Sequence, residues 1–463
     1  MRILPVVAPT AEQLELLTVN QHGVLVIKGA AGSGKTTTAL LRLRHLCGTW
    51  SARHRRLGLG TPVKVLVLTY NRTLEGYIAE LARQQVPTSD NIDLQVTTFA
   101  KFAGDLVGAN PDDYADTILA RLLSTFSMPR SFLQDEVQYV LGRFEFDKLE
   151  DYVTTVREGR GASPRMASPA RRRLLDEVIY PYLKEKQAYD VRDWNDIAVS
   201  AGKAPCQQWD VVIVDEAQDF SANQVRTILK HLAPDHSITF VIDAAQRIYP
   251  RSFTWKEVGL QVTGASSKTL RHNHRNSREI AAFARGVIDG MTVGDDGVLP
   301  DFDVAIESGP MPVVLVGTYS AQLQWVLDNI ISADNLSGES VVFLHPKGGR
   351  WFDYARRELR NNNIPLVELT RSRSWPAGNE NVALSTIHSA KGLEFDHVVI
   401  LGLNQQVTPH GDGEGDVGLE TLRRLLAMGI GRARRTVTLG FKAGTESSLV
   451  EFLNPATYLR INL

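Results

Sequence analysis

The sequence predicts an α/β protein with two parallel sheets, and three observations support this prediction. Short β-branched runs recur in both halves of the 463 residues, with helix-like segments between them. Polar or glycine-containing turns bound each run, which is typical of the alternating strands and helices of a parallel sheet. Between residues 105 and 205 this alternation stops, and long amphipathic segments predict a helical insertion.

The expected strands define two cores. In the first half they are residues 23–29, 63–71, 94–100, 211–217 and 238–244. In the second half they are residues 311–319, 339–347, 364–370, 382–388, 397–403 and 435–441. We therefore expect a first core formed by residues 1–104 and 205–269, a helical insertion at 105–204, and a second core at 270–463.

Composition limits the possible classes of protein. Hydrophobic residues make up 43% and charged residues 22% of the chain, which excludes a disordered or fibrous protein. No apolar run is long enough to span a bilayer and the N-terminus lacks a cationic leader, so no membrane role and a cytoplasmic location are expected. The two cysteines, Cys47 and Cys206, are too few and too far apart for a disulfide framework. Because the net charge is -1, any nucleic-acid binding must use a local basic path.

A phosphate-binding loop follows the first expected strand. Residues 29–36, GAAGSGKT, match the pattern G-x-x-x-x-G-K-[ST] between a strand and a helix-like segment. Glycines let the backbone N–H groups face phosphate oxygens, and the helix adds its positive end. Lys35 is expected to neutralise the phosphates and Thr36 to ligate Mg²⁺. The expected nucleotide contacts in this loop are Gly29, Ala30, Ala31, Gly32, Ser33, Gly34, Lys35, Thr36 and Thr37.

An acidic strand end supplies the second half of such a site. In VVIVDEAQD, residues 211–219, Asp215 is expected to hold Mg²⁺ together with Thr36, and Glu216 to orient or deprotonate the attacking water. The alternative is that both carboxylates cap the following helix. Together with the loop, they indicate hydrolysis of a nucleoside triphosphate.

These motifs belong to a longer series that resembles the UvrD/Rep/PcrA-like superfamily 1 helicases, a family with two RecA-like P-loop NTPase domains. The matching elements, in the order of the family, are TAEQ at 10–13, TYN at 69–71, TTFAKF at 97–102, DEAQD at 215–219, IDAAQRIY at 242–249, LRHNHRNSREI at 270–280, STIHSAKGLEF at 385–395 and RRLLAMGIGRARR at 423–435. The resemblance implies that the nucleotide is ATP. It further implies that Gln13 reads adenine, that Gln246 links nucleotide to nucleic acid within a motif that senses the γ-phosphate, that Arg275 contacts the γ-phosphate, that Glu394 binds ribose and that Arg432 is an arginine finger.

The positions of these groups suggest a motor. Lys35 and Asp215 belong to the first core, whereas Arg275 and Arg432 belong to the second, so closure of the cores would complete the ATP site. If both cores also bind one nucleic-acid strand, each cycle of closure and opening can move the contact of one core along the strand relative to the contact of the other. An arginine is nevertheless most often a solvated charge or part of a surface ion pair.

The resemblance and the aromatic residues suggest contacts to nucleic acid. The candidates are Tyr70, Asn71, Thr98, Phe99, Tyr249, Trp255 and His388. Aromatic rings can stack on bases of any sequence, although each ring could instead pack in a core. Arg171, Arg172 and Arg173 in the insertion could contact phosphates or form a solvated helix face.

Two functions remain open. The first is an ATP-driven translocase on single-stranded or partly duplex DNA, with the 3′ to 5′ polarity that the resemblance implies. The second is an ATP-gated sensor of nucleic acid that regulates a partner nuclease or a repair or defence protein. Residues 276–384 hold three strands that the second core needs, so the large accessory insertion of full-size relatives is expected to be reduced or absent.

Overall fold

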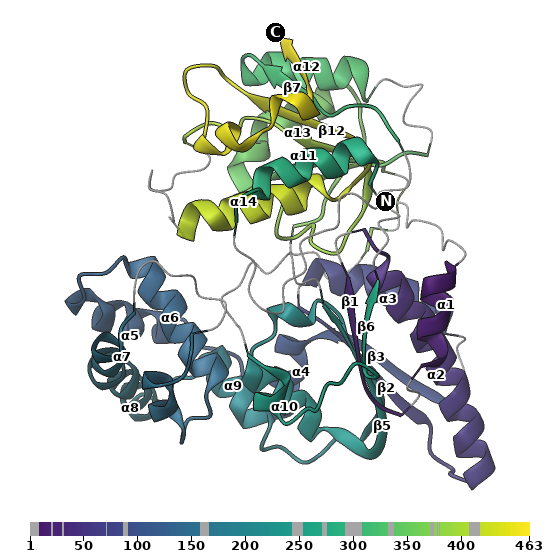
Figure 1. Cartoon of the computed structure of the whole chain (residues 1–463), viewed down its shortest axis with the longest axis vertical. Helices are drawn as coiled ribbons and strands as arrows, with labels where there is room; N and C mark the ends of the chain where they lie inside the picture. Colours follow the sequence, from purple (N-terminus) through teal and green to yellow (C-terminus); the bar gives the residue numbers. More distant parts are fainter. Residues whose placement is uncertain are drawn as a thin grey trace.

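The computed structural model describes most of the chain as two α/β lobes and a helical insertion (Figure 1). We call the first sheet and its helices the first lobe, and the second sheet and its helices the second lobe. The described residues are 9–19, 22–29, 32–70, 72–86, 91–157, 166–242, 253–270, 276–291, 308–331, 338–370, 375–376, 378, 380–406 and 417–463.

The first lobe is built on a parallel sheet whose described strands have the order β3-β2-β4-β5-β1-β6. Their bounds are β1 (Gly23–Gly29), β2 (Val63–Thr69), β3 (Ile92–Thr98), β4 (Trp209–Val214), β5 (Leu232–Ile242) and β6 (Ser267–Leu270). Helices cover both faces: α1 (Ala11–Thr18), α2 (Lys35–Leu57), α3 (Arg72–Gln85), α4 (Phe99–Val107) and α10 (Ala222–Lys230).

Alternate residues of β2 explain why both faces of this sheet are covered. Val65 and Val67 join the apolar cluster that includes residues of α2 and α3. Leu66 and Leu68 join a second cluster, which includes residues of α4 and α10. Successive side chains of a strand point to opposite faces, so a continuous apolar run needs a helix layer on each side.

The helical insertion has its own apolar core beside the first sheet (Figure 1). Its helices are α5 (Tyr114–Leu122), α6 (Arg130–Arg143), α7 (Ser168–Leu174), α8 (Tyr180–Ala188) and α9 (Trp194–Ala201). A π-helical turn, Leu175–Ile179, joins α7 directly to α8. Helix α9 also packs on α4, which attaches the insertion to the first lobe.

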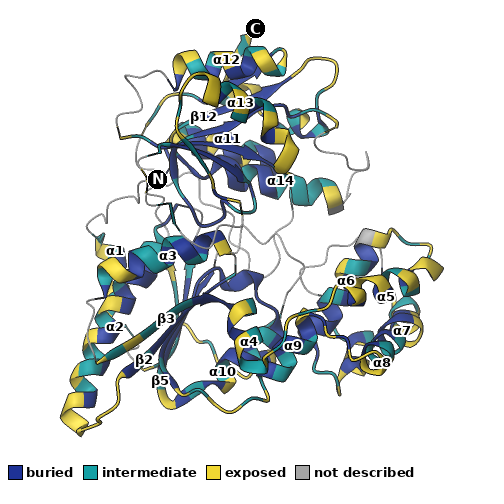
Figure 2. Cartoon of the chain, turned by 180° about the vertical axis from the view of Figure 1, so that it is seen from behind, coloured by how far each residue is buried: buried dark blue, intermediate teal, exposed yellow. Residues whose placement is uncertain are grey.

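The second lobe contains another parallel sheet, with the described strands in the order β13-β7-β12-β11-β8-β10-β9. Their bounds are β7 (Val313–Val316), β8 (Val341–His345), β9 (Leu366–Glu368), β10 (Val382–Thr386), β11 (Phe395–Ile400), β12 (Ala433–Phe441) and β13 (Leu459–Asn462). The helices are α11 (Arg278–Ile288), α12 (Tyr319–Asn329), α13 (Asp353–Asn361) and α14 (Val417–Ile430). As in the first lobe, the strands are buried between helix layers (Figure 2).

The prediction of an α/β fold with two parallel sheets is confirmed, and two strands were missed. Strands β6 (SKTL) and β13 (LRIN) lie at sheet edges, as β3 and β9 do, but each has only four residues and lacks a long apolar run. All described elements between residues 276 and 386 belong to the second sheet or its helices, so this described part holds no separate accessory domain. None of the helices that the structure describes is both long and apolar enough to cross a membrane.

Candidate active site

The phosphate-binding loop connects β1 to α2. Gly32 and Gly34 have φ angles of 85° and 73°, in the left-handed region that glycine adopts without strain. At Gly29, an added Cβ would lie 2.4 Å from the Ser33 Oγ and 3.2 Å from the carbonyl oxygen of Leu270, so a side chain here would crowd Ser33 and β6. Helix α2 begins at Lys35, which directs its N-terminus to the end of the loop. Ala30 and Ala31 lie outside the described residues.

Gln13 lies against this loop. Its backbone N–H and side chain form a capping box with Thr10 at the start of α1, where the Thr10 N–H donates to the Gln13 Oε1 at 3.0 Å. A Cβ on Gly34 would lie 2.4 Å from the Gln13 Nε2, so the absence of a side chain at Gly34 makes room for this amide. The structure thus brings Gln13 to the nucleotide loop, and its expected reading of adenine stays a prediction.

Thr36 and Asp215 form the expected metal pair. The Thr36 hydroxyl donates to the Asp215 Oδ2 at 3.2 Å, and the Asp215 N–H donates to the carbonyl oxygen of Leu68 at 2.9 Å. This backbone bond holds Asp215 at the tip of β4. Burial, followed by the charge of Glu216, raises the pKa of Asp215 to about 7. A hydroxyl beside a buried carboxylate is an oxygen donor set that suits Mg²⁺.

Glu216 adopts a backbone conformation that is rare for a residue with a side chain. Its φ is 53° and its ψ is 42°, in the left-handed region, which costs free energy and is typical of functional positions. The side-chain amide of Gln218 donates to the Glu216 Oε2. The strained backbone and this bond fix the direction of the carboxylate. The alternative that the carboxylates cap the following helix is not supported, because the side chain of Ser221 caps α10.

Positive charges from both lobes surround Glu216. Burial raises the pKa of Glu216, but nearby cations outweigh it and hold the pKa below its usual value. In order of decreasing effect, these cations are Lys391, Arg432 and Lys35. Lys391 and Arg432 belong to the second lobe, and Lys35 belongs to the first. The Glu216 carboxylate of the first lobe therefore lies near cations that the second lobe supplies.

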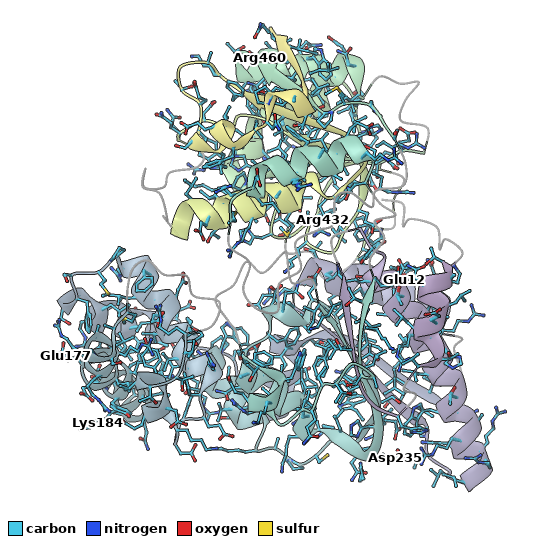
Figure 3. All side chains as sticks on the ribbon, viewed as in Figure 1. Glu12, Glu177, Lys184, Asp235, Arg432 and Arg460 are labelled. Carbon is cyan, nitrogen blue, oxygen red and sulfur yellow. The ribbon has the colours of Figure 1, made fainter. Side chains whose placement is uncertain are left out.

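Arg432 lies on the side of the second lobe that faces the first (Figure 3). It follows α14 and precedes β12, and it is 2% exposed. Its carbonyl oxygen accepts a hydrogen bond from the Phe395 N–H at 3.0 Å, which fixes the backbone next to β11. The structure thus places this predicted finger beside the first lobe, and its role in hydrolysis stays a prediction.

Lys391 makes two ion pairs from the second lobe to the first. Its Nζ lies 2.5 Å from the Asp219 Oδ2 and 3.5 Å from the Glu216 Oε2. Sequence reasoning did not select Lys391 or assign a partner to Asp219. Asp219 lies in the motif DEAQD and Lys391 in STIHSAKGLEF. The opposite charges of these two motif residues were the sequence signal that could have predicted their pairing.

The four remaining expected nucleotide contacts are Gln246, Arg275, Thr37 and Glu394. Gln246 and Arg275 lie outside the described residues. Thr37 is half-buried in the first turn of α2. Glu394 is half-buried directly before β11, and its expected contact with ribose stays a prediction.

The nucleic-acid candidates have different surroundings. Phe99 is 4% exposed, and its ring contacts those of Phe102 and Phe220 in the core. Thr98 is buried and caps α4 by accepting a hydrogen bond from the Lys101 N–H at 3.3 Å. These contacts account for both residues structurally.

The remaining nucleic-acid candidates are less buried. Tyr70 is half-buried with its ring 6.0 Å from that of Phe220. Trp255 packs on Phe240 with a ring separation of 4.9 Å and is also half-buried. His388 is half-buried after β10, and burial lowers its pKa. Asn71 and Tyr249 lie outside the described residues.

The arginine cluster of the insertion is engaged within the chain. Arg171 donates to the carbonyl oxygens of Met166 and Thr155 at 2.8 and 2.7 Å. Arg172 pairs with Glu150, and Arg173 pairs with Glu177. These contacts favour the solvated helix face over the phosphate path, because each guanidinium already has carbonyl or carboxylate partners.

Comparisons with known families agree with this geometry. A model described as an AAA domain matches residues 13–251, more than half of the 463 residues. A model described as the UvrD-like helicase C-terminal domain matches residues 360–442. The chain belongs to the UvrD-like helicase family. The two matches cover the loop with Lys35 and Asp215 in one lobe, and Lys391 and Arg432 in the other.

Relatives of this UvrD-like helicase match it over different lengths. A probable DNA helicase of Mycoplasma pneumoniae is 22% identical over 95% of this chain and 84% of that protein. The ATP-dependent DNA helicase Rep of Buchnera aphidicola is 34% identical over 17% of this chain and 11% of its own length. The ATP-dependent DNA helicase PcrA of Bacillus subtilis is 36% identical over 16% of this chain and 10% of its own length. The chain thus spans most of the Mycoplasma protein but matches only short parts of Rep and PcrA.

A solved structure also matches part of the chain. The C-terminal domain of a possible DNA helicase from Lactobacillus plantarum WCFS1 is 21% identical, with a TM-score of 0.30. The match covers 40% of this chain and 98% of that domain.

Proposed function

We propose that this UvrD-like helicase is a DNA-stimulated ATPase that moves along single-stranded DNA with 3′ to 5′ polarity. In this proposal, the first core is residues 1–104 and 205–269, the second core is residues 270–463, and ATP lies between them. The observation that carries the proposal is the meeting of Lys391 and Arg432 from the second lobe with Glu216 of the first. Opening of the lobes would separate these groups, so hydrolysis and lobe motion would be coupled.

The residues of the first lobe support binding of the triphosphate of ATP. The N-terminus of α2 and the loop N–H groups favour phosphate oxygens. Lys35 lies close enough to lower the pKa of both Asp215 and Glu216 by its charge, so its ammonium faces the same space. A triphosphate held by the loop would therefore extend toward the two carboxylates.

Thr36 and Asp215 would hold Mg²⁺. Burial and the charge of Glu216 raise the pKa of Asp215, and a bound divalent cation would offset both effects by favouring the charged carboxylate. When bound, the cation would neutralise charge on the phosphates of the nucleotide.

The chain's own residues would then perform hydrolysis. In the overall step, a water oxygen forms a bond to the γ-phosphorus and the bond from that phosphorus to the bridging oxygen breaks, which yields ADP and phosphate. Glu216 would orient the water and accept its proton. Arg432 would stabilise the charge on the phosphoryl group during transfer.

The proposal is tested by the rate of ATP hydrolysis on oligothymidylates of increasing length. A translocase gives a rate that rises with length and then saturates, because longer strands allow more steps before release at an end. We expect Lys35→Ala to abolish this turnover, whereas Lys442→Ala, a change at an exposed lysine of the second lobe, should leave it unchanged. Unstimulated hydrolysis at every length would refute the proposal.

Polarity requires a separate measurement. We expect displacement of a streptavidin block from a biotin at the 5′ end of a strand and little displacement from the 3′ end. The reverse preference would refute the proposed polarity while leaving the ATPase in place. The described residues hold no feature that favours the alternative of an end sensor with a partner nuclease.

A further inference from the structure

Lys391 lies in a turn of the second lobe that is pressed against the first. The turn follows β10, and the Lys391 N–H donates to the carbonyl oxygen of His388 at 3.2 Å. Gly392 has a φ of 82°, and a Cβ at this position would lie 2.6 Å from the Leu74 Cδ1 of α3. The absence of a side chain at Gly392 therefore lets the residue next to Lys391 approach α3 of the first lobe closely.

Further contacts hold the second lobe close to α3. The Thr73 hydroxyl donates to the carbonyl oxygen of Leu369 at 2.7 Å, in a buried hydrogen bond between the lobes. The rings of Tyr77 and Trp375 lie 4.9 Å apart. Because both contacts involve α3, the position of Lys391 relative to the first lobe is set by packing as well as by charge.

The ammonium of Lys391 is buried between two carboxylates of the first lobe. Lys391 is 3% exposed and Asp219 is 0% exposed, with 2.5 Å between the Nζ and the Oδ2. Glu216 is the second partner, at 3.5 Å. Since the shorter distance is to Asp219, this carboxylate anchors the ammonium, and the longer contact directs it to the Oε2 of Glu216. That oxygen also accepts the hydrogen bond from Gln218.

We infer that Lys391 is a positioning residue for ATP hydrolysis, which orients the Glu216 carboxylate only while the lobes are together. This inference rests on the proposed function. Asp219 holds the ammonium in place, and Lys391 with Gln218 then fixes one oxygen of Glu216 so that the other can face the water.

A purely structural role of Lys391 and a positioning role predict different kinetic effects when Lys391 is replaced. If Lys391 only joined the lobes, its loss would weaken binding of the nucleotide between them. A positioning residue instead affects the chemical step, because a carboxylate displaced by about 1 Å can cost roughly a hundredfold in rate. The ratio of the effects on kcat and KM therefore separates the two roles.

The experiment measures steady-state ATP hydrolysis with saturating oligothymidylate for four variants. Lys391→Met keeps the length of the side chain and removes its charge, and we expect kcat to fall roughly a hundredfold with little change in the KM for ATP. Lys391→Arg should recover a large part of the rate, because a guanidinium can pair with both carboxylates. Asp219→Asn should also lower kcat, and Lys442→Met is the matched exposed control.

The double variant Lys391→Met with Asp219→Asn should be no slower than Lys391→Met alone, because both changes remove one interaction. An unchanged kcat in Lys391→Met, or a raised KM with normal kcat, would overturn the inference and leave the ATPase in place. If Lys391→Met does not fold, a normal kcat in Asp219→Asn would overturn it. Absence of DNA-stimulated hydrolysis in the unaltered protein would instead refute the proposed function.

Discussion

The hydroxyl of Thr36 donates a hydrogen bond to the carboxylate of Asp215 at 3.2 Å, although the two residues lie 179 positions apart. One belongs to the first turn of α2 and the other to the tip of β4. Parallel strands end at the same edge of their sheet, so the loop after β1 and the end of β4 meet there. This pair is the basis for the expected Mg²⁺ dependence.

Asp215→Asn should raise the Mg²⁺ concentration needed for half-maximal ATP hydrolysis and lower the maximal rate. Loss of the anionic ligand weakens binding of a hard cation, for which carboxylate oxygens are preferred. The measurement is the hydrolysis rate over a Mg²⁺ titration, with EDTA as the reference without metal. Asp210→Asn, which changes a partly exposed carboxylate at the other end of β4, is the matched control. A normal titration for Asp215→Asn would remove Asp215 from the metal site.

Arg432→Ala should lower kcat roughly a thousandfold, the low end of the range for an arginine that stabilises phosphoryl transfer. Nucleotide affinity should change little, because the guanidinium acts on charge that develops during the reaction. Single-turnover hydrolysis and binding of a fluorescent ATP analogue measure the two effects separately. Arg435→Ala, an exposed change in the same segment, should behave like the unaltered protein. Equal loss of affinity and rate in Arg432→Ala would contradict the role of a finger.

Arg172→Ala should leave the salt dependence of DNA binding unchanged. Arg172 pairs with Glu150 on the exposed surface of the insertion, and its neighbours also have partners within the chain. A residue that contacts a phosphate would reduce the slope of log K against log salt by about one. Fluorescence anisotropy of a labelled oligothymidylate over a range of salt concentrations decides the question. A reduced slope for Arg172→Ala would show that Arg172 contacts DNA phosphates.

Buried Arg42 joins α1 to the sheet. Its guanidinium donates to the carbonyl oxygens of Leu16 and Val19 at 2.8 and 2.6 Å and to the Thr239 hydroxyl at 3.0 Å. These carbonyls lie at the C-terminal end of α1, where helices have no internal donors. Arg42→Met should lower the free energy of unfolding by about 2–4 kcal/mol, because several buried acceptors lose their donor.

Urea unfolding followed by circular dichroism measures this effect, and the exposed Arg44→Met on the same helix is the control. Helix α1 also carries Gln13, so Arg42→Met should weaken ATP binding as well. If Arg42→Met were as stable as Arg44→Met, the guanidinium would not be what holds α1 in place.

Local patterns were sufficient to predict the catalytic half of the first lobe. The glycine spacing around Gly32 and Gly34, the strand before them and the acidic strand end at Asp215 are each encoded within a few residues. Their assembly follows from the common edge of a parallel sheet. For the same reason the two sheets could be predicted, whereas the short edge strands β6 and β13 could not, since their four residues form no continuous apolar run.

Contacts between the lobes could not be predicted in this way. Lys391 and Asp219 stand in separate motifs, and their pairing depends on how two separately folded units pack. That arrangement is set by the contacts of α3, such as Thr73 with Leu369, which have no spacing signature. The partner of Arg172 is likewise a matter of tertiary packing, so its charge alone left two interpretations open.

His345 should make stability depend on pH. Burial, followed by the charge of Lys347, lowers the pKa of His345 to about 4. Its Nδ1 accepts hydrogen bonds from the N–H groups of Lys347 and Gly348, both at 3.0 Å, which requires a neutral ring. In the unfolded chain the pKa is about 6.5, so the unfolded state takes up a proton first as the pH falls.

The contribution of His345 is therefore complete above pH 6.5 and is lost as the pH falls toward 4, by about 3 kcal/mol at most. In His345→Asn, the Oδ1 can accept the same two N–H groups without titrating. We expect melting temperatures of the unaltered protein to fall more steeply from pH 7 to pH 5 than those of His345→Asn. Parallel curves for the two proteins would show that protonation of His345 does not oppose folding, because the variant differs from the unaltered protein mainly in lacking this titrating ring.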